Sequence, residues 1–228
     1  MTSLLTLCSK CVGNSLKCLK CDCKVIKYGK TKSGKQRYLC RKCSKSQVDY
    51  YTYNAYNPEL NKNIILLTKE GLGIRSTARI LKIATSTLLK RIVFIANSIE
   101  NPIISFGKEY EVDEMRTFIK HKKNLIWIVY ALEKKSKKVV SFNIGKRTNK
   151  TLNFVLNSLK LSKSTRIYTD KLKNYKYLLN KKIHSTKLFG KNHIERNNLT
   201  IRTHLKRLNR KTICYSKSSV MLTAILKL

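Results

Sequence analysis

Acidic residues are scarce in this sequence. Of its 228 residues only 12 are Asp or Glu, against 49 Lys and Arg, so the formal net charge is +37. The last 95 residues, from Lys134 on, contain just Asp170 and Glu195. A coding bias toward Lys would raise the number of cations but would not remove carboxylates. A field this positive attracts a polyanion, most commonly nucleic acid, so we expect a nucleic-acid-binding protein.

The sequence also lacks a long apolar run. No stretch of 18 apolar residues is present, and the N-terminal MTSLLTLCSK has neither the basic n-region nor the apolar h-region of a secretion signal. These absences argue against a membrane-spanning or secreted protein and indicate a reducing compartment. We therefore expect no membrane partner and a cytoplasmic location.

Cysteines are concentrated at one end, since seven of the eight lie in the first 43 residues. In a reducing compartment such a cluster indicates a metal site rather than disulfides. Two CxxC pairs separated by eighteen residues match the spacing of a four-cysteine zinc site. We predict a zinc ribbon over residues 1–56 that binds one structural Zn²⁺ ion. Cys8, Cys11 and Cys23 compete as ligands, but the spacing favours Cys18, Cys21, Cys40 and Cys43.

The stretch GKTKSGKQ, residues 29–36, matches the outline of a phosphate-binding loop, G-x4-G-K. The next residue, Gln36, stands where Ser or Thr would hold magnesium. No strand–loop–helix frame fits between the two cysteine pairs. We interpret this stretch as a basic turn of the ribbon.

Residues 57–105 are predicted to be helical. The segment IRSTARIL, 74–81, is followed by a short turn at 82–84 and a second helical pattern, TSTLLKRIVFIANSI. Two helices joined by a tight turn are typical of a helix-turn-helix DNA-binding domain, although a small helical bundle or a dimerisation element would give the same pattern. The residues expected to contact DNA are Arg75, Thr85, Ser86, Thr87 and Lys90.

Residues 106–228 change period and predict an α/β domain. KEYEVDEM, 108–115, alternates as a strand, with Glu111, Asp113 and Met115 on one face. LIWIVYAL, 125–132, is continuously apolar, as expected of a central strand buried on both faces. Further predicted elements are a strand at 137–145, a helix at 151–159, a strand at 166–170 and a helix at 193–208. This order resembles the ribonuclease-H-like fold.

The scarce carboxylates fall at informative places in this layout. Asp113 lies in the first strand, Asp170 ends the fourth, and Glu195 lies near the start of the last helix. If the first and fourth strands are neighbours, the two Asp side chains converge and Glu195 can face them. Three carboxylates are a suitable ligand set for two Mg²⁺ or Mn²⁺ ions, which activate a nucleophile and stabilise a leaving oxygen in phosphoryl transfer.

Structural roles for these carboxylates remain open at this point. Asp113 could pair with a Lys or Arg, and Glu114 could take its place. Asp170 could cap a turn. Glu195 could pair with Arg202 or occupy the favourable first turn of its helix.

Several motifs together resemble the transposases of insertion sequence one. They are YGKTKSGKQRYLCRKC, GLGIRSTARIL and VDE…YTDKLKNY…HIERNNLTIRTHLKRLNRKT…YSKS, in the family's order, from about Cys18 to the end of the chain. The 24 residues between Asp170 and Glu195 are similar to the family's DDE spacing. The resemblance implies that Asp113, Asp170 and Glu195 are the catalytic, metal-binding residues. It also implies that three residues of the same motif contact DNA or orient Glu195: His193, Arg196 and Asn197.

The resemblance implies a function as well. A zinc finger and a helix-turn-helix would bind the terminal inverted repeats of an insertion element, and a DDE domain would cut and join DNA strands. The expected partner is double-stranded DNA, both element ends and target, in a prokaryotic nucleoid, with a homo-oligomer assembled on the DNA. One departure is the C-terminal stretch SVMLTAILKL, which has no acid where relatives can carry one. The alternatives are a degenerate or truncated zinc/helix-turn-helix DNA-binding protein without catalytic activity and a structure-selective nuclease.

Overall fold

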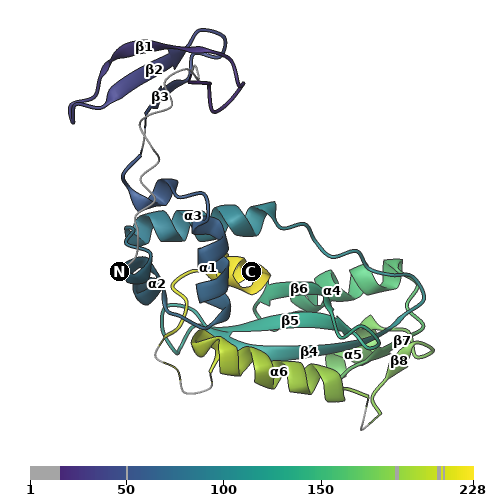
Figure 1. Cartoon of the computed structure of the whole chain (residues 1–228). Coiled ribbons are helices and arrows are strands. Elements are labelled where there is room, and N and C mark those ends of the chain that lie inside the picture. The colour runs from purple at the N-terminus through teal and green to yellow at the C-terminus, as the bar shows by residue number, and fades with distance from the viewer. Residues whose placement is uncertain (1–15, 50, 188–189, 210–211, 213) are drawn as a thin grey trace. The chain divides into compact units, whose positions relative to one another are not determined.

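The computed structural model describes residues 16–49, 51–187, 190–209, 212 and 214–228. The chain divides into two compact units, Met1–Tyr56 and Asn57–Leu228, and each is described by itself (Figure 1). The expected boundary at residue 56 falls between the units, whereas the expected boundary at residue 105 falls inside the second unit. The second unit therefore contains both the helix-turn-helix segment and the α/β segment.

The first unit contains a three-stranded antiparallel sheet with the strand order β1 (Val25–Lys30), β2 (Gln36–Cys40), β3 (Ser46–Val48). The β1–β2 hairpin closes where the Thr31 backbone N–H donates to the Lys35 carbonyl at 2.8 Å. Gly34 in this turn has a φ of +77°, which glycine adopts without strain. The predicted basic turn is thus the turn of the β1–β2 hairpin at residues 31–35, and the rest of the stretch 29–36 belongs to the ends of the two strands. A short 3₁₀ helix, η1 (Asn54–Tyr56), follows the sheet.

The second unit begins with the helices α1 (Leu60–Lys69), α2 (Ile74–Ile80) and α3 (Thr85–Ser98). Between α2 and α3 the chain turns at Lys82, whose φ is +51°, and buries Ile83. Each helix buries one face, to which Ile64, Ala78 and Leu88 contribute. The predicted pair of helices with a tight turn is confirmed.

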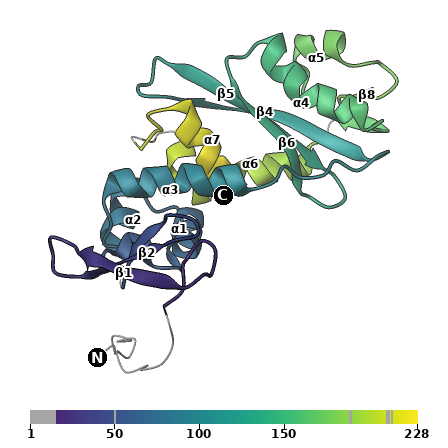
Figure 2. The same ribbon diagram turned by 90° about the horizontal axis from the view of Figure 1, so that it is seen from above.

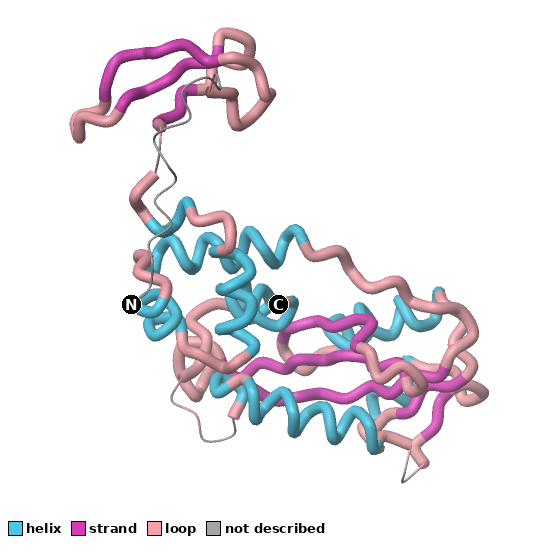
Figure 3. Tube along the Cα trace, in the orientation of Figure 1, coloured by secondary structure: helices cyan, strands magenta, loops and turns pink. Residues whose placement is uncertain are grey.

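A five-stranded sheet with the order β6-β5-β4-β7-β8 follows. Its strands are β4 (Glu109–Phe118), β5 (Leu125–Glu133), β6 (Val139–Gly145), β7 (Arg166–Tyr168) and β8 (His184–Ser185). The strands β4, β5 and β6 pair antiparallel, whereas β7 is parallel to β4 and β8 is parallel to β7. Figure 3 shows the strands of this sheet in magenta with helices in cyan beside them. The first and fourth predicted strands are therefore neighbours.

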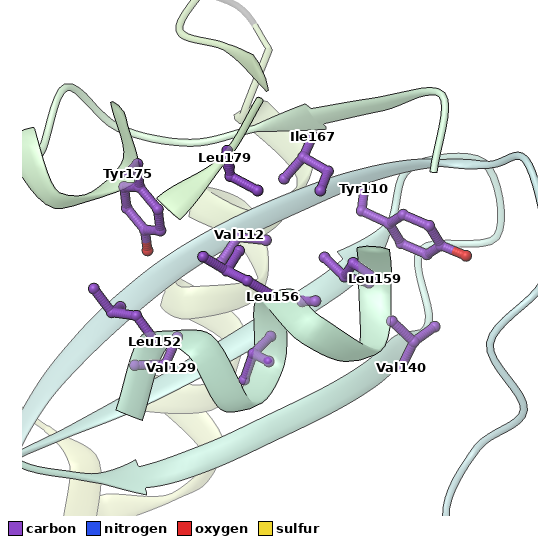
Figure 4. Close-up of a cluster of buried hydrophobic side chains, with 12 residues drawn as sticks. Tyr110, Val112, Val129, Val140, Leu152, Leu156, Leu159, Ile167, Tyr175 and Leu179 are labelled. Carbon is purple, nitrogen blue, oxygen red and sulfur yellow. The ribbon is translucent and has the colours of Figure 1, made fainter. Parts of the chain in front are cut away.

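Helices pack on both faces of this sheet (Figures 1 and 2). One face carries α4 (Asn149–Leu161) and α5 (Lys173–Leu178), and the other carries α6 (Asn192–His204) and α7 (Ser219–Lys227). The strand β5 is buried on both sides, because Val129 belongs to the first core and Tyr130 to the second. Figure 4 shows the first core, where Val112, Leu156 and Ile167 meet. Each fully buried aliphatic side chain contributes roughly 1.5–3 kcal/mol.

The helix-turn-helix segment is joined to the sheet by two contacts within the second unit. Helix α7 packs against α3 (Figure 2). Gly71, after α1, lies so close to the end of α6 that a Cβ there would be 2.1 Å from the carbonyl oxygen of His204. Both contacts join segments far apart in the sequence. The sequence around residue 105, where a domain boundary was expected, therefore gave no sign of them. In the part of the chain that the structure describes, no helix is long and apolar enough to cross a membrane.

Two elements end earlier than their patterns predicted. The strand predicted at 166–170 ends at Tyr168, because the chain turns at Asp170. The helix predicted at 193–208 ends at His204 and is followed by a 3₁₀ turn, η2 (Lys206–Leu208). Leu208 is buried although it lies beyond the end of the helix. The helical spacing of apolar residues therefore extends past the helix itself, which is why the pattern predicted a longer helix.

Candidate active site and cysteine cluster

Four cysteines of the first unit form a compact cluster. The Sγ atoms of Cys18, Cys21, Cys40 and Cys43 all lie within 4.8 Å of one another, and three of their separations are 3.4–3.5 Å. A tetrahedral zinc ion with bonds of about 2.3 Å requires sulfur atoms about 3.8 Å apart. The cluster therefore fits Zn²⁺ with only a small expansion.

The backbone forms this cluster through two tight knuckles. The Cys18 backbone N–H donates to the Cys23 carbonyl at 2.8 Å, and Asp22 between them has a φ of +55°. In the second knuckle the Cys40 N–H donates to the Lys45 carbonyl at 3.0 Å. Cys23 thus closes the first knuckle through its carbonyl group, and its thiol is not part of the four-sulfur cluster. Cys8 and Cys11 lie outside the described residues.

The thiols of the cluster differ in acidity. A backbone N–H from Lys20 is the main cause that lowers the pKa of Cys18 to about 6, and one from Cys43 lowers the pKa of Cys40. The backbone N–H of Cys23 also lowers the pKa of Cys21, but hydrogen bonds with neighbouring thiols and burial outweigh it and raise that pKa to about 12. Four thiolates this close repel one another unless a cation lies between them.

Asp113 on β4 and Asp170, just after β7, lie near enough for the charge of Asp170 to act on the Asp113 carboxyl. The parallel register pairs Glu109 with Arg166 and Glu111 with Tyr168, the last residue of β7, and Asp170 follows two residues later in the turn. Asp170 Oδ1 accepts a hydrogen bond from the Leu172 backbone N–H at 3.0 Å, so part of this carboxylate caps the turn after β7.

The Asp113 carboxyl is electrostatically strained. Burial is the main cause that raises its pKa, and the negative charge of Asp170 raises the pKa further. The Glu114 backbone N–H, the Lys191 ammonium and the Asn198 amide act in the opposite direction. Two carboxylates in a partly buried place are a donor set that fits a hard divalent cation.

Glu195 lies in the first turn of α6, on the same face of the sheet as Asp113. Its side chain is 60% exposed and pairs with Lys191 at 3.5 Å. Among the described residues, only the four cysteines bring three or more potential ligand atoms within 4.8 Å of one another. Asp113 and Asp170 thus interact through their charges, while Glu195 is paired with Lys191.

Sequence patterns did not single out Glu111. This side chain is fully buried and accepts two hydrogen bonds from α6, from His193 Nδ1 at 2.7 Å and from the Ile194 backbone N–H at 2.8 Å. His193 was expected to contact DNA or orient Glu195, and its imidazole here binds the strand β4. Strand alternation placed Glu111 on the α6 face but could not reveal its partners.

Further polar contacts hold α6 on the sheet. Asn198 donates to Asp113 Oδ2 at 2.8 Å and accepts from the Tyr130 hydroxyl at 2.8 Å. Asn197, another expected DNA contact, donates to the same hydroxyl at 3.3 Å. Arg196 is exposed on the opposite side of the helix. Only Arg196 of the three expected α6 contacts therefore has a fully exposed position.

Glu114 points to the opposite face of β4. Its side chain is 2% exposed and accepts hydrogen bonds from Arg147 Nη2 at 2.8 Å and from the Tyr175 hydroxyl at 2.5 Å. Arg147 also lies over the Trp127 ring, 4.5 Å from its centroid. Burial raises the pKa of Tyr175, and the charge of Glu114 adds to this effect. Glu114 therefore cannot take the place of Asp113 opposite α6.

Of the helix-turn-helix residues expected to contact DNA, Arg75 lies near the start of α2 and the others lie in the first two turns of α3. Their side chains are exposed except for Thr87, which is half-buried: Arg75, Thr85, Ser86, Thr87 and Lys90. Leu88 and Ile92 on the other side of α3 are buried in the helical core. The exposed side of α3 begins without acidic residues in its first turn, as suits a surface that meets phosphates.

Family models match two regions of the chain. The model described as IS1 transposase matches residues 109–226, which include all three candidate carboxylates. The model described as InsA C-terminal domain matches residues 51–93, which include the helix-turn-helix pair.

Individual relatives were also found. The insertion element iso-IS1n protein InsB of Shigella dysenteriae is 37% identical over 108 residues, which are 47% of this chain and 82% of that protein. A chain in the cryoEM structure of the simian T-cell lymphotropic virus intasome in complex with PP2A regulatory subunit B56 gamma is 15% identical. This likeness covers 72% of the present chain and 65% of that chain with a TM-score of 0.38, too low to carry an argument.

Proposed function

The chain belongs to the IS1 transposase family and contains its helix-turn-helix, and from this premise we propose that it binds the ends of an insertion element and cleaves and transfers DNA strands. The observation that supports the chemical part is the parallel pairing of β4 with β7, together with the charge interaction between Asp113 on β4 and Asp170 just after β7. Glu195 on α6 is the third residue of the proposed catalytic set.

Divalent metal ions would be held by these three carboxylates. Bound Mg²⁺ or Mn²⁺ supplies a lowered pKa for an attacking water or 3′-hydroxyl and charge stabilisation for the leaving oxygen. In the chain itself, Asp113 and Asp170 would concentrate negative charge between the central strand β4 and the end of β7. Lys191 pairs with Glu195, and release of this ion pair would free that carboxylate to bind metal with the other two.

DNA binding is proposed to use both units. The zinc-loaded ribbon and the exposed residues at the start of α3 would contact the element ends, while the net charge of +37 favours phosphate contacts in general. We expect this binding to weaken steeply as salt rises, because each neutralised phosphate releases counterions. Assembly of two or more copies on the DNA remains part of the proposal.

One observation favours a second candidate function, a DNA-binding protein without catalytic activity. The Glu195 side chain is 60% exposed and its carboxylate is paired with the Lys191 ammonium. A chain in which this pair persisted on DNA would occupy element ends without cutting them.

Strand cleavage at element ends distinguishes the two functions. Asp113→Asn, Asp170→Asn and Glu195→Gln should each reduce Mg²⁺- or Mn²⁺-dependent cleavage at least about a hundredfold, since the metal contribution amounts to several kcal/mol. Binding to the same DNA should remain. The matched control is Glu109→Gln, an acid of the same strand whose partners are Lys134 and Tyr168. Wild-type cleavage in all three variants would refute the assignment, and a wild-type chain that binds but never cleaves would favour the second function.

A further inference from the structure

Two acids flank Asp113 on β4, and each joins this strand to a helix that carries or directly follows one of the other two candidate carboxylates. Glu111 binds the start of α6, which carries Glu195. Glu114 binds α5, which follows Asp170. We propose that Glu111 and Glu114 are positioning residues that set Glu195 and Asp170 relative to Asp113. This inference rests on the proposed metal-dependent function.

Glu111 acts as the missing cap of α6. The N-cap residue of this helix, Lys191, makes no side-chain capping hydrogen bond, and the Ile194 N–H belongs to the first turn, where backbone donors have no partner within the helix. Glu111 supplies that partner from the neighbouring strand, at 2.8 Å. A carboxylate without exposure to solvent needs such donors, because burying it unpaired is costly. Glu111 and the helix start therefore require each other.

The position of this contact is what links it to the candidate active site. Glu111 precedes Asp113 by two residues on the same face of the strand, roughly 7 Å along it. Ile194 immediately precedes Glu195 on the helix. The Asn198–Asp113 hydrogen bond fixes the next turn of the helix. A shift of the helix start would therefore move Glu195 relative to Asp113 by a similar amount.

Glu114 fixes helix α5 on the sheet, as Glu111 fixes the start of α6. The Tyr175 hydroxyl binds its Oε1 atom, and Tyr175 belongs to α5, five residues after Asp170. The Leu172 N–H that binds Asp170 Oδ1 lies in the N-cap residue of the same short helix. Arg147 binds the other oxygen, Oε2, and balances the charge. Glu114 thus holds α5, and with it the turn that presents Asp170.

Neither acid is available as a metal ligand. In each carboxylate both oxygens already accept a hydrogen bond, and the side chains are 0% and 2% exposed respectively. They act through other residues and not on the substrate. This division of roles also accounts for the local concentration of acids on β4 in a chain that is otherwise poor in them.

The primary experiment measures Mn²⁺ binding by electron paramagnetic resonance on the full-length, zinc-loaded protein, with Asp113→Asn as the blank. Glu111→Gln and Glu114→Gln should each weaken Mn²⁺ binding about tenfold or more, as loss of partners around metal ligands typically does. Affinity for element-end DNA and zinc content should not change. Glu109→Gln, on the same strand, should bind Mn²⁺ as the wild type does.

Hydrogen exchange tests the mechanism independently of metal and activity. Glu111→Gln should speed exchange at the first turn of α6 and leave α5 unchanged, whereas Glu114→Gln should do the reverse. Variants of the residues that donate hydrogen bonds to the two acids change the fold less, and they control for misfolding of the Glu111 and Glu114 variants. Tyr175→Phe should weaken Mn²⁺ binding as Glu114→Gln does. His193→Ala should weaken it too, while His193→Asn, which keeps a nitrogen donor on the same carbon position, should restore much of the loss.

The outcomes separate this inference from the function on which it rests. If Asp113→Asn abolishes Mn²⁺ binding but the Glu111 and Glu114 variants bind it normally, the positioning role is wrong and the metal site stands. If those variants only lower the unfolding temperature, with metal affinity intact, their role is purely structural and the inference is again wrong. A folded wild-type protein that binds no Mn²⁺ beyond the blank overturns both.

Discussion

The cysteine cluster and the carboxylate site are assembled in different ways. The four cysteines lie between residues 18 and 43, and two local knuckles bring their sulfur atoms within 4.8 Å. The candidate carboxylates lie between residues 113 and 195, on a strand, in the turn after another strand and on a helix, so their arrangement depends on the packing of the second unit. A cluster of the first kind is built by one short segment. A site of the second kind is built from contacts between elements far apart in the sequence, such as those that Glu111 and Glu114 make.

The largest expected effect tests the dependence of the first unit on metal. Cys40→Ser, or a strong zinc chelator, should unfold the ribbon and leave the second unit folded, because structural zinc sites contribute about 10–16 kcal/mol of apparent binding free energy. Circular dichroism and backbone amide spectra of each unit would report this. Cys23→Ser is the matched control and should retain zinc, since its thiol lies outside the cluster. Simultaneous unfolding of both units would contradict the conclusion that the cysteine cluster depends on the first unit alone.

The next effect concerns the packing that holds the second site. Ile194 is fully buried on the α6 face, so Ile194→Ala should destabilise the second unit by about 2–5 kcal/mol through lost burial and a cavity. Urea unfolding measures this free energy. Leu199→Ala on the same helix removes an exposed side chain and should change stability by less than about 0.5 kcal/mol. Equal losses in the two variants would contradict the assigned face of α6.

Patterns in the sequence predicted local features well. The clustering of the four cysteines follows from their spacing because each knuckle is a short turn. The faces of β4 follow from alternation, and the double burial of β5 follows from its continuous apolar run. In each case neighbouring residues carry the whole signal.

Partners across the fold could not be predicted in the same way. Alternation put Glu111 on a face but said nothing of His193, 82 residues away. The packing of α7 on α3 joins opposite ends of the second unit. The strand β8, with two residues, is too short to leave a periodic pattern. The orientation of Glu195 depends on Lys191 one turn earlier, a choice that spacing does not make.

A smaller effect tests whether the helix-turn-helix and the sheet form one unit. Gly71→Ala would place a Cβ 2.1 Å from the His204 carbonyl oxygen at a φ of +73°, so it should cost about 1–3 kcal/mol. Gly73→Ala is the matched control, because no atom lies within 4 Å of its Cβ position. Urea unfolding followed at α3 and at the sheet should shift together for Gly71→Ala. Independent shifts would indicate two separate domains with a boundary near residue 105.

The smallest expected effect is a change in stability with pH that comes from the buried charge of Asp113. Because burial raises the pKa of this carboxyl in the folded chain, its ionisation opposes folding, and stability is lost as pH rises from the unfolded-state pKa through the folded-state pKa. Asp113→Asn should therefore stabilise the metal-free protein at neutral pH, and the gain should vanish below the unfolded-state pKa. Thermal unfolding at a series of pH values measures this difference. Saturating Mn²⁺ should reverse the ranking, since the ion binds only the wild-type carboxylate set. If Asp113→Asn is no more stable than the wild type at neutral pH, Lys191 and Asn198 already balance the buried charge of Asp113. The carboxylates would then need a cation less than the four clustered cysteines do.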